Sequence, residues 1–339
     1  MTTSDSTDAQ PIVPAGIDVV GVGNAIVDVI THATDAFVTE QGLAKGSMTL
    51  IGTERAHELY SLMGPAIEAS GGSAANTMVG VASFGGSAAY IGKVSSDILG
   101  TVFGHDMRAA GVSFDVPAAT TGPATARCLI LVTPDAQRTM STYLGVSSLL
   151  EPADIDASTV EPGRLLFCEG YLWDVDLAKQ AIVKAMDLAR AAGRVSALTL
   201  SDTFCVERHR TEFRDLVAGR VDLLFANQAE LATLYETHDH DAGVAAVSAD
   251  VALTCVTLGP RGSLIVSGSD VVEIAPVEPP RVVDTTGAGD QYAAGVLFGL
   301  ARGFDLAECG RLGSVAAAEV ISHVGPRPME SLSALARQW

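Results

Sequence analysis

The alternation of short apolar runs with amphipathic helical segments is the feature that most constrains how this chain can fold. Residues 17–23 (IDVVGVG) form an apolar run that ends in glycine, which is typical of a buried parallel strand leading into a loop. The same pattern returns four times, at residues 164–168, 194–200, 221–227 and 251–259. A helical pattern at 175–193 lies between two of these runs and closes on Gly193, a residue suited to the position after a helix end. The pattern predicts a doubly wound α/β fold, with a mostly parallel central sheet flanked by helices.

Two stretches, residues 26–51 and 125–144, carry strand-like patterning without a crossover helix. The second reads as two strands around a turn at residues 134–137 (PDAQ). Strands that cannot join the parallel sheet could form a small second sheet. We expect this sheet to be a lid over one end of a single α/β domain at residues 17–339; a pair of surface hairpins is the alternative. Residues 1–16 are polar, lack the charged and apolar regions of a signal peptide, and are expected to be a disordered tail.

Charge and apolar content exclude several classes of protein. The chain has 40 Asp and Glu against 21 Lys and Arg, a net charge of −19, whereas nucleic acids and anionic membranes are bound by basic surfaces. No apolar run approaches the ~18 residues needed to cross a membrane. We therefore expect a soluble cytoplasmic protein with neither kind of partner. The cysteines lack the spacing of a zinc site or disulfide framework and are expected to be buried thiols in a reducing compartment: Cys128, Cys168, Cys205, Cys255 and Cys309.

The strongest chemical motif is DTTGAGD at residues 284–290, directly before a helical run at 291–302. Three small residues let the backbone approach a ligand: Gly287, Ala288 and Gly289. The first N–H groups of a helix have no partner within it, and they suit a phosphate or a developing oxyanion. Asp290 would lie beside that anion site and could accept the proton of an attacking hydroxyl. The alternative is a glycine-rich turn in which Asp284 or Asp290 stabilises the helix start.

Two further segments offer polar side chains for a hydroxylated ligand. Gly71 and Gly72 precede a helix of small residues, from which Asn76 could hydrogen-bond substrate hydroxyls or cap neighbouring backbone. Asn24 and Asp28 follow the first strand, where the main sheet passes to the expected lid. Their side chains could hydrogen-bond the hydroxyl groups of a polyol, or they could be solvated loop residues. A dinucleotide fingerprint is excluded at this strand end, because it requires glycine where Ile26 stands.

Asn227 and Glu230 follow another predicted strand and could orient hydrated magnesium from one helix face. Their spacing equally fits a capping box, which is the structural alternative that the spacing favours. Residues 257–264 (TLGPRGSL) predict a strand, a glycine-rich turn and a strand, which could touch phosphates or merely turn. No phosphate-binding P-loop motif is present; residues 86–93 come nearest but have the wrong spacing.

Together these segments resemble the ribokinase-like family, the PfkB carbohydrate and purine kinases. The two family signatures match GGSAAN at residues 71–76 and DTTGAGD at 284–290, and the N-x-x-E element matches Asn227 and Glu230. The resemblance extends over residues 18–328. It implies an enzyme, an ATP-dependent phosphotransferase with an alcohol as acceptor, and it implies Mg²⁺ as cofactor.

The resemblance also implies roles for individual residues. Asp290 matches the general base, and Asn227 and Glu230 match the pair that organises magnesium through water. The backbone of three residues matches the anion hole: Gly287, Ala288 and Gly289. Substrate hydroxyls are expected at Asn24, Asp28, Gly71, Gly72, Ser73 and Asn76. The ATP-binding edge, including Asn227, is expected at Thr257, Gly259 and Gly262. Many members bind a monovalent cation such as K⁺ near the equivalents of Asp284 and Thr286.

Within the family, GNAIVDV at residues 23–29 resembles the adenosine kinase branch. Residues 198–210 are similar to the Leu-x-Leu-Ser-x-x-Phe segment of that branch, which makes Phe204 a candidate contact to the base. The resemblance also makes Arg138, on the expected lid, a candidate contact to ATP phosphate. The expected reaction is phosphorylation of the 5′-hydroxyl of adenosine to give AMP. The alternatives are a sugar kinase of the same family, acting on ribose, fructose or similar, and a non-catalytic nucleotide- or sugar-binding regulator. Either a monomer or a homodimer is compatible with the sequence.

Overall fold

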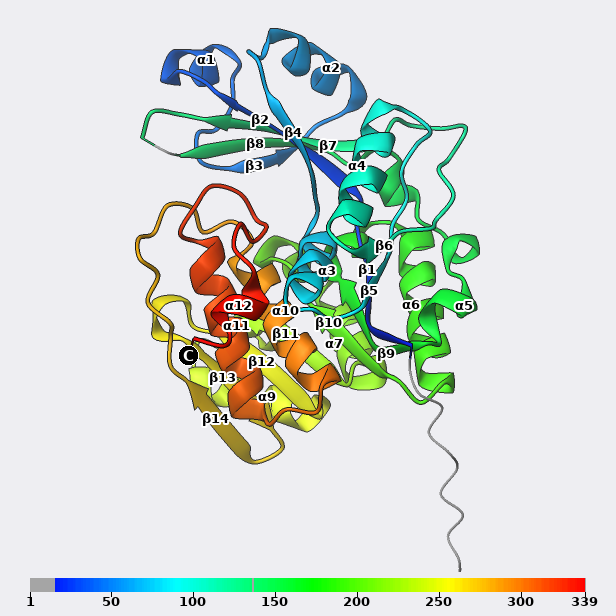
Figure 1. Ribbon diagram of the computed structural model, residues 1–339, viewed down its shortest axis with the longest axis vertical. Coiled ribbons are helices and arrows are strands. Elements are labelled where there is room, and N and C mark those ends of the chain that lie inside the picture. Colours follow the sequence, from blue (N-terminus) through cyan, green and yellow to red (C-terminus); the bar gives the residue numbers. More distant parts are fainter. Residues whose placement is uncertain (1–15, 136, 339) are drawn as a thin grey trace, which may run out of the picture.

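The computed structural model describes residues 16–135 and 137–338 (Figure 1). The tail predicted at residues 1–16 therefore lies outside the described residues, apart from Gly16. Within the described chain a small sheet lies over one end of a large sheet, and helices surround both (Figure 1).

In the described residues the large sheet has nine strands in the order β14-β13-β12-β11-β10-β9-β1-β5-β6. Seven of them are parallel: β1 (Ile17–Val22), β5 (Ala88–Ile91), β6 (Val112–Ser113), β9 (Gly163–Glu169), β10 (Val195–Thr199), β11 (Leu223–Asn227) and β12 (Leu253–Thr257). Two antiparallel strands complete one edge, β13 (Ser263–Ser267) and β14 (Asp270–Ile274). The predicted α/β fold with a mostly parallel sheet is confirmed. The five apolar runs became strands because a parallel sheet covered on both faces has no polar side.

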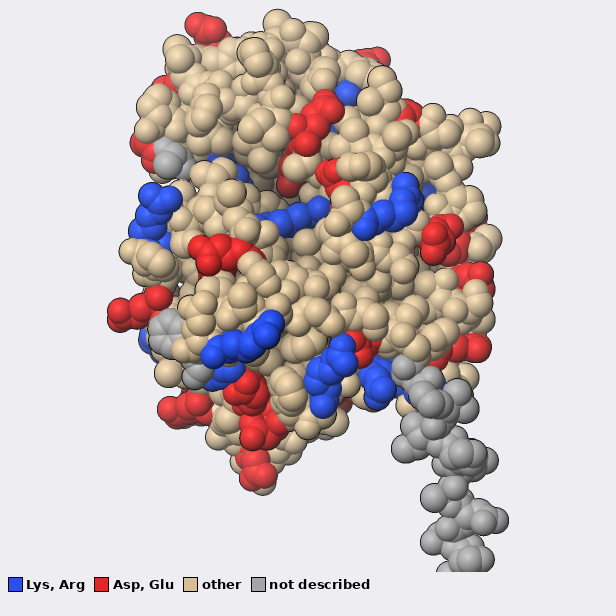
Figure 2. Space-filling view, in the orientation of Figure 1, with Lys and Arg blue, Asp and Glu red and all other residues tan. Residues whose placement is uncertain are grey.

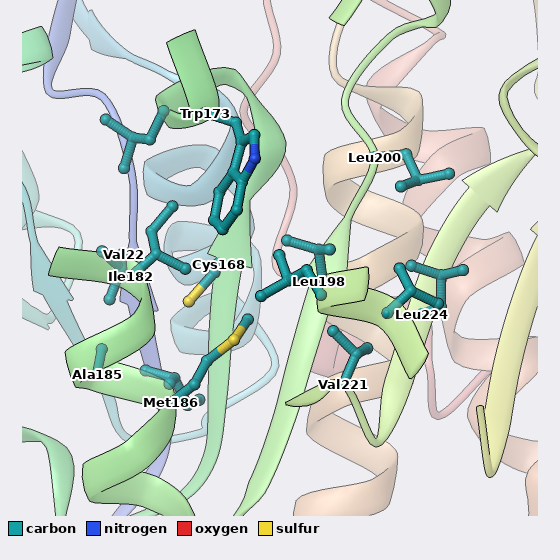
Figure 3. Packing of buried hydrophobic residues seen from close by; sticks show 14 of the residues in the cluster. Val22, Cys168, Trp173, Ile182, Ala185, Met186, Leu198, Leu200, Val221 and Leu224 are labelled. Carbon is teal, nitrogen blue, oxygen red and sulfur yellow. The ribbon is translucent and has the colours of Figure 1, made fainter. Parts of the chain in front are cut away.

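Helices cover both faces of this sheet. One face carries α3 (Ser73–Ser83), α4 (Ile98–Ala109), α10 (Ala288–Ala301) and α11 (Leu306–Val320), which share a core with Val19 of β1. The other face carries α5 (Ala157–Val160), α6 (Asp176–Ala191), α7 (Thr203–Arg220), α8 (Gln228–Tyr235) and α9 (His240–Asp250). Figure 3 shows part of this second core, where Ile182 and Met186 of α6 lie beside Val22 and Cys168 of the sheet. Shorter elements complete the fold: α12 (Leu332–Leu335) and the 3₁₀ turns Gly145–Leu149, Pro152–Asp154, Gly170–Asp174 and Gly259–Arg261.

The small sheet has the order β3-β8-β7-β2-β4. Its strands are β2 (Ile26–His32), β3 (Met48–Leu50), β4 (Ile67–Gly71), β7 (Ala126–Val132) and β8 (Arg138–Tyr143). Both stretches predicted to form this sheet contribute strands, and β7 and β8 pair antiparallel around the predicted turn. The prediction missed β4, which adds an edge strand beside β2. Two helices cover the outer face, α1 (Asp35–Glu40) and α2 (Thr53–Leu62), around a core that includes Leu59 and Leu129.

Surface charge and helix composition bear on the expected partners. On the face shown in Figure 2, described acidic and basic side chains are interspersed and form no continuous basic field. No helix in the described part of the chain is long and apolar enough to cross a membrane. The cytoplasmic location stays a prediction.

Helix α8 begins with a capping box. The Asn227 side chain accepts from the Glu230 N–H at 2.9 Å, and the Glu230 carboxylate accepts from the Asn227 N–H at 2.9 Å and from Asn227 Nδ2 at 2.6 Å. The structural alternative for this pair is thus realised. Glu230 is buried, and burial raises the pKa of its carboxyl from the ordinary 4.5 to about 7.

We predict that Glu230→Gln stabilises the ligand-free protein increasingly as pH rises. A carboxyl whose folded pKa is raised contributes stability below pH 4.5 that is lost as pH rises through about 7, whereas glutamine stays neutral and keeps the bond from the Asn227 N–H but loses the bond from Asn227 Nδ2. That loss is the same at every pH, so the unfolding free energy of the variant relative to the wild type should rise by about 2 kcal/mol between pH 5.5 and pH 8, measured by urea denaturation. Glu308→Gln is the matched control, because Glu308 occupies the same helix position on α11 but is only half-buried and pairs with Arg311. An equal change in unfolding free energy at both pH values would contradict the raised pKa of Glu230.

Candidate active site

A cavity of about 990 Å³ lies between the carboxyl ends of the parallel strands and the small sheet. Residues at the ends of β9, β10, β11 and β12 line it: Glu169, Thr199, Asn227 and Thr257. Open α/β sheets bind their ligands at this edge. Thirteen of the predicted site residues line the cavity: Asn24, Asp28, Gly72, Ser73, Asn76, Phe204, Asn227, Glu230, Thr257, Thr286, Gly287, Gly289 and Asp290. The other six are not among the residues that line it: Gly71, Arg138, Gly259, Gly262, Asp284 and Ala288.

Asp290 joins the two sequence signatures. It lies in the first turn of α10, and its carboxylate accepts hydrogen bonds from Ser73 Oγ at 2.6 Å and Asn76 Nδ2 at 3.1 Å, both on α3. Burial raises the pKa of the Asp290 carboxyl, and these two hydrogen bonds oppose the rise. The result is a carboxylate oriented on both oxygens at the cavity floor, which is the arrangement that a general base needs.

The start of α10 is shaped to receive an anion. Gly287 precedes the helix with φ of 79°, a conformation that favours glycine, and a Cβ there would come within 2.7 Å of Pro326. Gly289 faces open space. The first N–H groups of this helix thus lie at the positive end of its dipole, next to the cavity and beside Asp290.

Arg138 of β8 reaches across from the small sheet to the DTTGAGD segment. Its Nη1 lies 2.9 Å from Asp284 Oδ2 and 3.1 Å from Thr286 Oγ1. Asp284 also accepts from the N–H and hydroxyl of Thr286 and from the N–H of Gly325. Protein donors therefore surround the carboxylate beside which K⁺ is expected, and the cation stays a prediction. Arg138 Nη2 is buried without a hydrogen-bond partner among the described residues, and Arg138 is not among the residues that line the cavity, so its contact with ATP phosphate stays a prediction.

Glu169 is a buried carboxylate that sequence reasoning missed. It accepts from the N–H and Nδ2 of Asn24, both at 2.7 Å, and from the N–H of Ala74 at 2.9 Å. Ser147 donates to Asn24 Oδ1 at 2.9 Å. Burial raises the pKa of Glu169 to about 7. Asn24 is thus clamped from both ends of its amide, and Glu169 holds the start of α3 against the end of β1. A glutamate closing the apolar run at 164–168 was the available signal.

Asp28 explains the double glycine of the first signature. A Cβ on Gly71 would lie 2.5 Å from Asp28 Oδ2, and a Cβ on Gly72 would lie 2.2 Å from the Asn24 carbonyl oxygen. The glycines thus make room for the two predicted substrate residues. Burial raises the pKa of Asp28 to about 6, with Arg327 and Arg138 lowering it and Asp290 raising it.

Glycine has a different role at the predicted ATP edge. Gly259 and Gly262 have positive φ in the turn between β12 and β13, and a Cβ on Gly262 would lie 2.1 Å from the Ile274 carbonyl oxygen. They shape the turn behind the cavity, while Thr257 lines it. Contact of this edge with ATP stays a prediction.

The polar groups near α8 suit an indirectly held magnesium ion. Asn227 and Glu230 offer the oxygen donors that Mg²⁺ prefers, but the described residues contain no cluster of three or more His, Cys, Asp or Glu that could hold a metal. The side-chain oxygens of both residues already accept hydrogen bonds within the capping box, so the pair would meet Mg²⁺ through water, and this role stays a prediction.

Apolar side chains of the small sheet form the opposite wall of the cavity. Ile26, Cys128, Ile130 and Met140 pack together on this inner face and line the cavity. Phe204 of α7 lines it too and is 70% exposed. The cavity is thus polar at the strand ends and apolar beneath the small sheet.

Comparisons with known proteins agree with this geometry. The family model described as "pfkB family carbohydrate kinase" matches residues 48–332. The crystal structure of adenosine kinase from Sinorhizobium meliloti is 50% identical, with a TM-score of 0.89 over 95% of this chain and 99% of that one. A structure described as a probable sugar kinase protein from Rhizobium etli is 47% identical, with a TM-score of 0.89 over 95% of this chain and 98% of that one.

A curated relative from Archaeoglobus fulgidus, named an uncharacterized sugar kinase, is 26% identical over 249 residues, which are 74% of this chain and 97% of its own. The family model covers far more than half of the chain, and both solved relatives span nearly all of it. Kinases of this family generally use ATP and Mg²⁺. The chain therefore belongs to the pfkB family of carbohydrate kinases and is a phosphotransferase that acts on a hydroxyl group.

Proposed function

We propose that the protein transfers the γ-phosphoryl group of ATP to the 5′-hydroxyl of adenosine, giving AMP and ADP. The observation that carries this proposal is the Asp290 carboxylate, held by Ser73 and Asn76 beside the start of α10. A base and an anion site are thus adjacent on one wall of the cavity. A non-catalytic regulator would not need such an oriented carboxylate.

In the proposed reaction Asp290 accepts the proton of the 5′-hydroxyl as its oxygen attacks the γ-phosphorus. The bond between that phosphorus and the β–γ bridging oxygen breaks, and ADP leaves. N–H groups at the start of α10 stabilise the charge on the transferring group. Bound Mg²⁺ supplies further positive charge at the phosphates, and Asn227 and Glu230 would hold its water shell.

The two-sided cavity favours a nucleoside as acceptor. Asn24, Asp28 and Asn76 offer polar groups near Asp290, where a ribose would place its hydroxyls. Ile130, Met140 and the exposed Phe204 offer apolar surface, which suits a planar base. The relative named adenosine kinase, 50% identical to this chain, supports the same acceptor.

A sugar kinase is the second candidate. Relatives described as sugar kinases include one at 47% identity, and its match with this chain covers 98% of that relative. A sugar would use the polar side of the cavity and leave the apolar wall without a partner.

The small sheet would act as a lid. Its inner face lines the cavity, and Arg138 links it to the DTTGAGD segment on the main body. Closure would exclude water, which limits hydrolysis of ATP and strengthens the interactions of Asp290 and the anion site.

The acceptor can be tested with MgATP and a panel of adenosine, guanosine, ribose and fructose. We expect adenosine to give the highest kcat/KM, by at least about 100-fold over the free sugars, because they make no contact with the apolar wall. ADP release and product identity by mass spectrometry check this. Preference for a free sugar would establish the second candidate, and binding without turnover would favour a regulator.

Asp290→Asn tests the base directly. Asparagine keeps the shape and can still accept one hydrogen bond, but it cannot take the substrate proton. We expect kcat to fall by roughly 10² to 10⁴ while the dissociation constant of ATP stays near that of the wild type. Asp305→Asn is the matched control, since Asp305 caps α11 away from the cavity and asparagine caps equally well. A kcat unchanged by Asp290→Asn would rule out this base.

A further inference from the structure

The segment after α11, residues 321–331, braces the active site from behind. The N–H of Gly325 donates to Asp284 Oδ2 at 2.9 Å, and the Pro326 carbonyl accepts from Gln291 Nε2 at 3.0 Å. Glu319 Oε1 accepts from the N–H groups of Met329 and Glu330 at 2.8 and 2.9 Å. The backbone on both sides of Arg327 is therefore fixed relative to α10 and α11.

From this braced segment the Arg327 side chain reaches α3. Its Nε donates to Asn76 Oδ1 at 3.2 Å, and Nη1 donates to Ser70 Oγ. Nη2 lies 3.5 Å from Met107 Sδ. Arg327 is partly buried, and desolvation lowers the pKa of its guanidinium to about 10. The interactions that hold it in place come from α4, the end of β4 and α3.

The chemistry of Arg327 determines which way the Asn76 amide points. A guanidinium N–H can only donate, so the carbonyl oxygen of the amide must face Arg327. The amide nitrogen then faces Asp290 Oδ2, 3.1 Å away, and donates to it. The reversed amide would set its NH₂ group against the guanidinium and its oxygen against the carboxylate, both unfavourable. Gln291 Nε2 also donates to the backbone carbonyl oxygen of Asn76 at 3.0 Å, so the backbone that carries the side-chain amide is fixed.

We infer that Arg327 is a positioning residue for the catalytic base: it fixes the Asn76 amide in the orientation that donates to Asp290. The inference rests on the proposed role of Asp290 as base. Arg327 itself acts through Asn76, and no contact joins it to Asp290.

Other titratable and charged groups lie near Asp290, and the orientation of the Asn76 amide does not change their charges. Asp28 and Glu169 lie near enough for the Asp290 charge to raise the pKa of each. Burial raises the pKa of Tyr171, and Asp290 adds to the rise. Arg138 and Arg327 both lower the pKa of Asp28. Loss of Arg327 would therefore act on Asp28 by charge and on Asp290 by the amide, and the experiment must separate the two.

The test begins with Arg327→Met in the full-length enzyme, with Arg311→Met as control because Arg311 is likewise partly buried but pairs with Glu308 on α11 and is not among the residues that line the cavity. Without Arg327 the amide is free to turn, Asp290 loses a donor to its ionised form, and its pKa rises. The acid limb of the pH profile of kcat should move up by about one pH unit, so kcat measured at a pH below that limb should fall by about 10-fold. The KM for ATP should change by less than about 3-fold, since Arg327 is not among the residues that line the cavity.

A double-mutant cycle separates the amide from the charge. In an Asn76→Ala background the amide is gone, so adding Arg327→Met should lower kcat by less than about 2-fold. A Ser73→Ala background removes the other donor to Asp290 but keeps the Asn76 amide, so adding Arg327→Met there should again lower kcat by about 10-fold. Arg327→Lys keeps the buried charge and guards against a variant that fails to fold. We expect it to fold, to keep the acceptor KM and to show part of the acid-limb shift.

Equal losses in the wild-type and Asn76→Ala backgrounds, or an acid limb that does not move in either Arg327 variant, would overturn the inference. Failure of the proposed function looks different. In that case the wild-type enzyme would not phosphorylate any acceptor of the panel, or Asp290→Asn would remain fully active.

Discussion

The hydrogen bonds from Ser73 and Asn76 to Asp290 join the two halves of the site, and much of the structure serves to make them possible. They require α3 and α10 to pack closely, and a Cβ on Gly80 would lie 2.6 Å from the Ala294 Cβ. Gln291 adds a bond from α10 to the Asn76 carbonyl. A carboxylate in a poorly hydrated cavity needs such donors to remain ionised, because burial alone favours its protonated form.

The small sheet connects to this centre through charge. Arg138 on β8 meets Asp284, the first residue of the motif that ends at Asp290, and both side chains are only 9% exposed. The same sheet brings its apolar inner face over the polar strand ends. The pair of Arg138 and Asp284 therefore links the small sheet to the segment that carries the proposed anion site.

The fold could be predicted further than the site. Buried parallel strands are continuous apolar runs, so β1 and β9 to β12 were visible in the sequence, whereas β4 (IEASG) is a short, partly polar edge strand with no pattern to mark it. Small residues before helices marked the two signatures. Glu169 and Arg327 were missed because burial of a charged residue depends on tertiary contacts; Arg327 and Asn76 are 251 residues apart. The capping box at Asn227 was foreseen from spacing, because caps are local.

The central claim is that the Asp290 carboxylate, oriented by α3, takes the proton of the acceptor hydroxyl. Direct titration of this carboxyl by ¹³C NMR, assigned by comparison with Asp290→Asn, tests it best when set beside the pH profile of kcat/KM. The account predicts a pKa above the ordinary 3.8 of aspartate, and an acid limb of the profile at that same pKa. A pKa at or below the ordinary value, or an acid limb that follows another group, would contradict it.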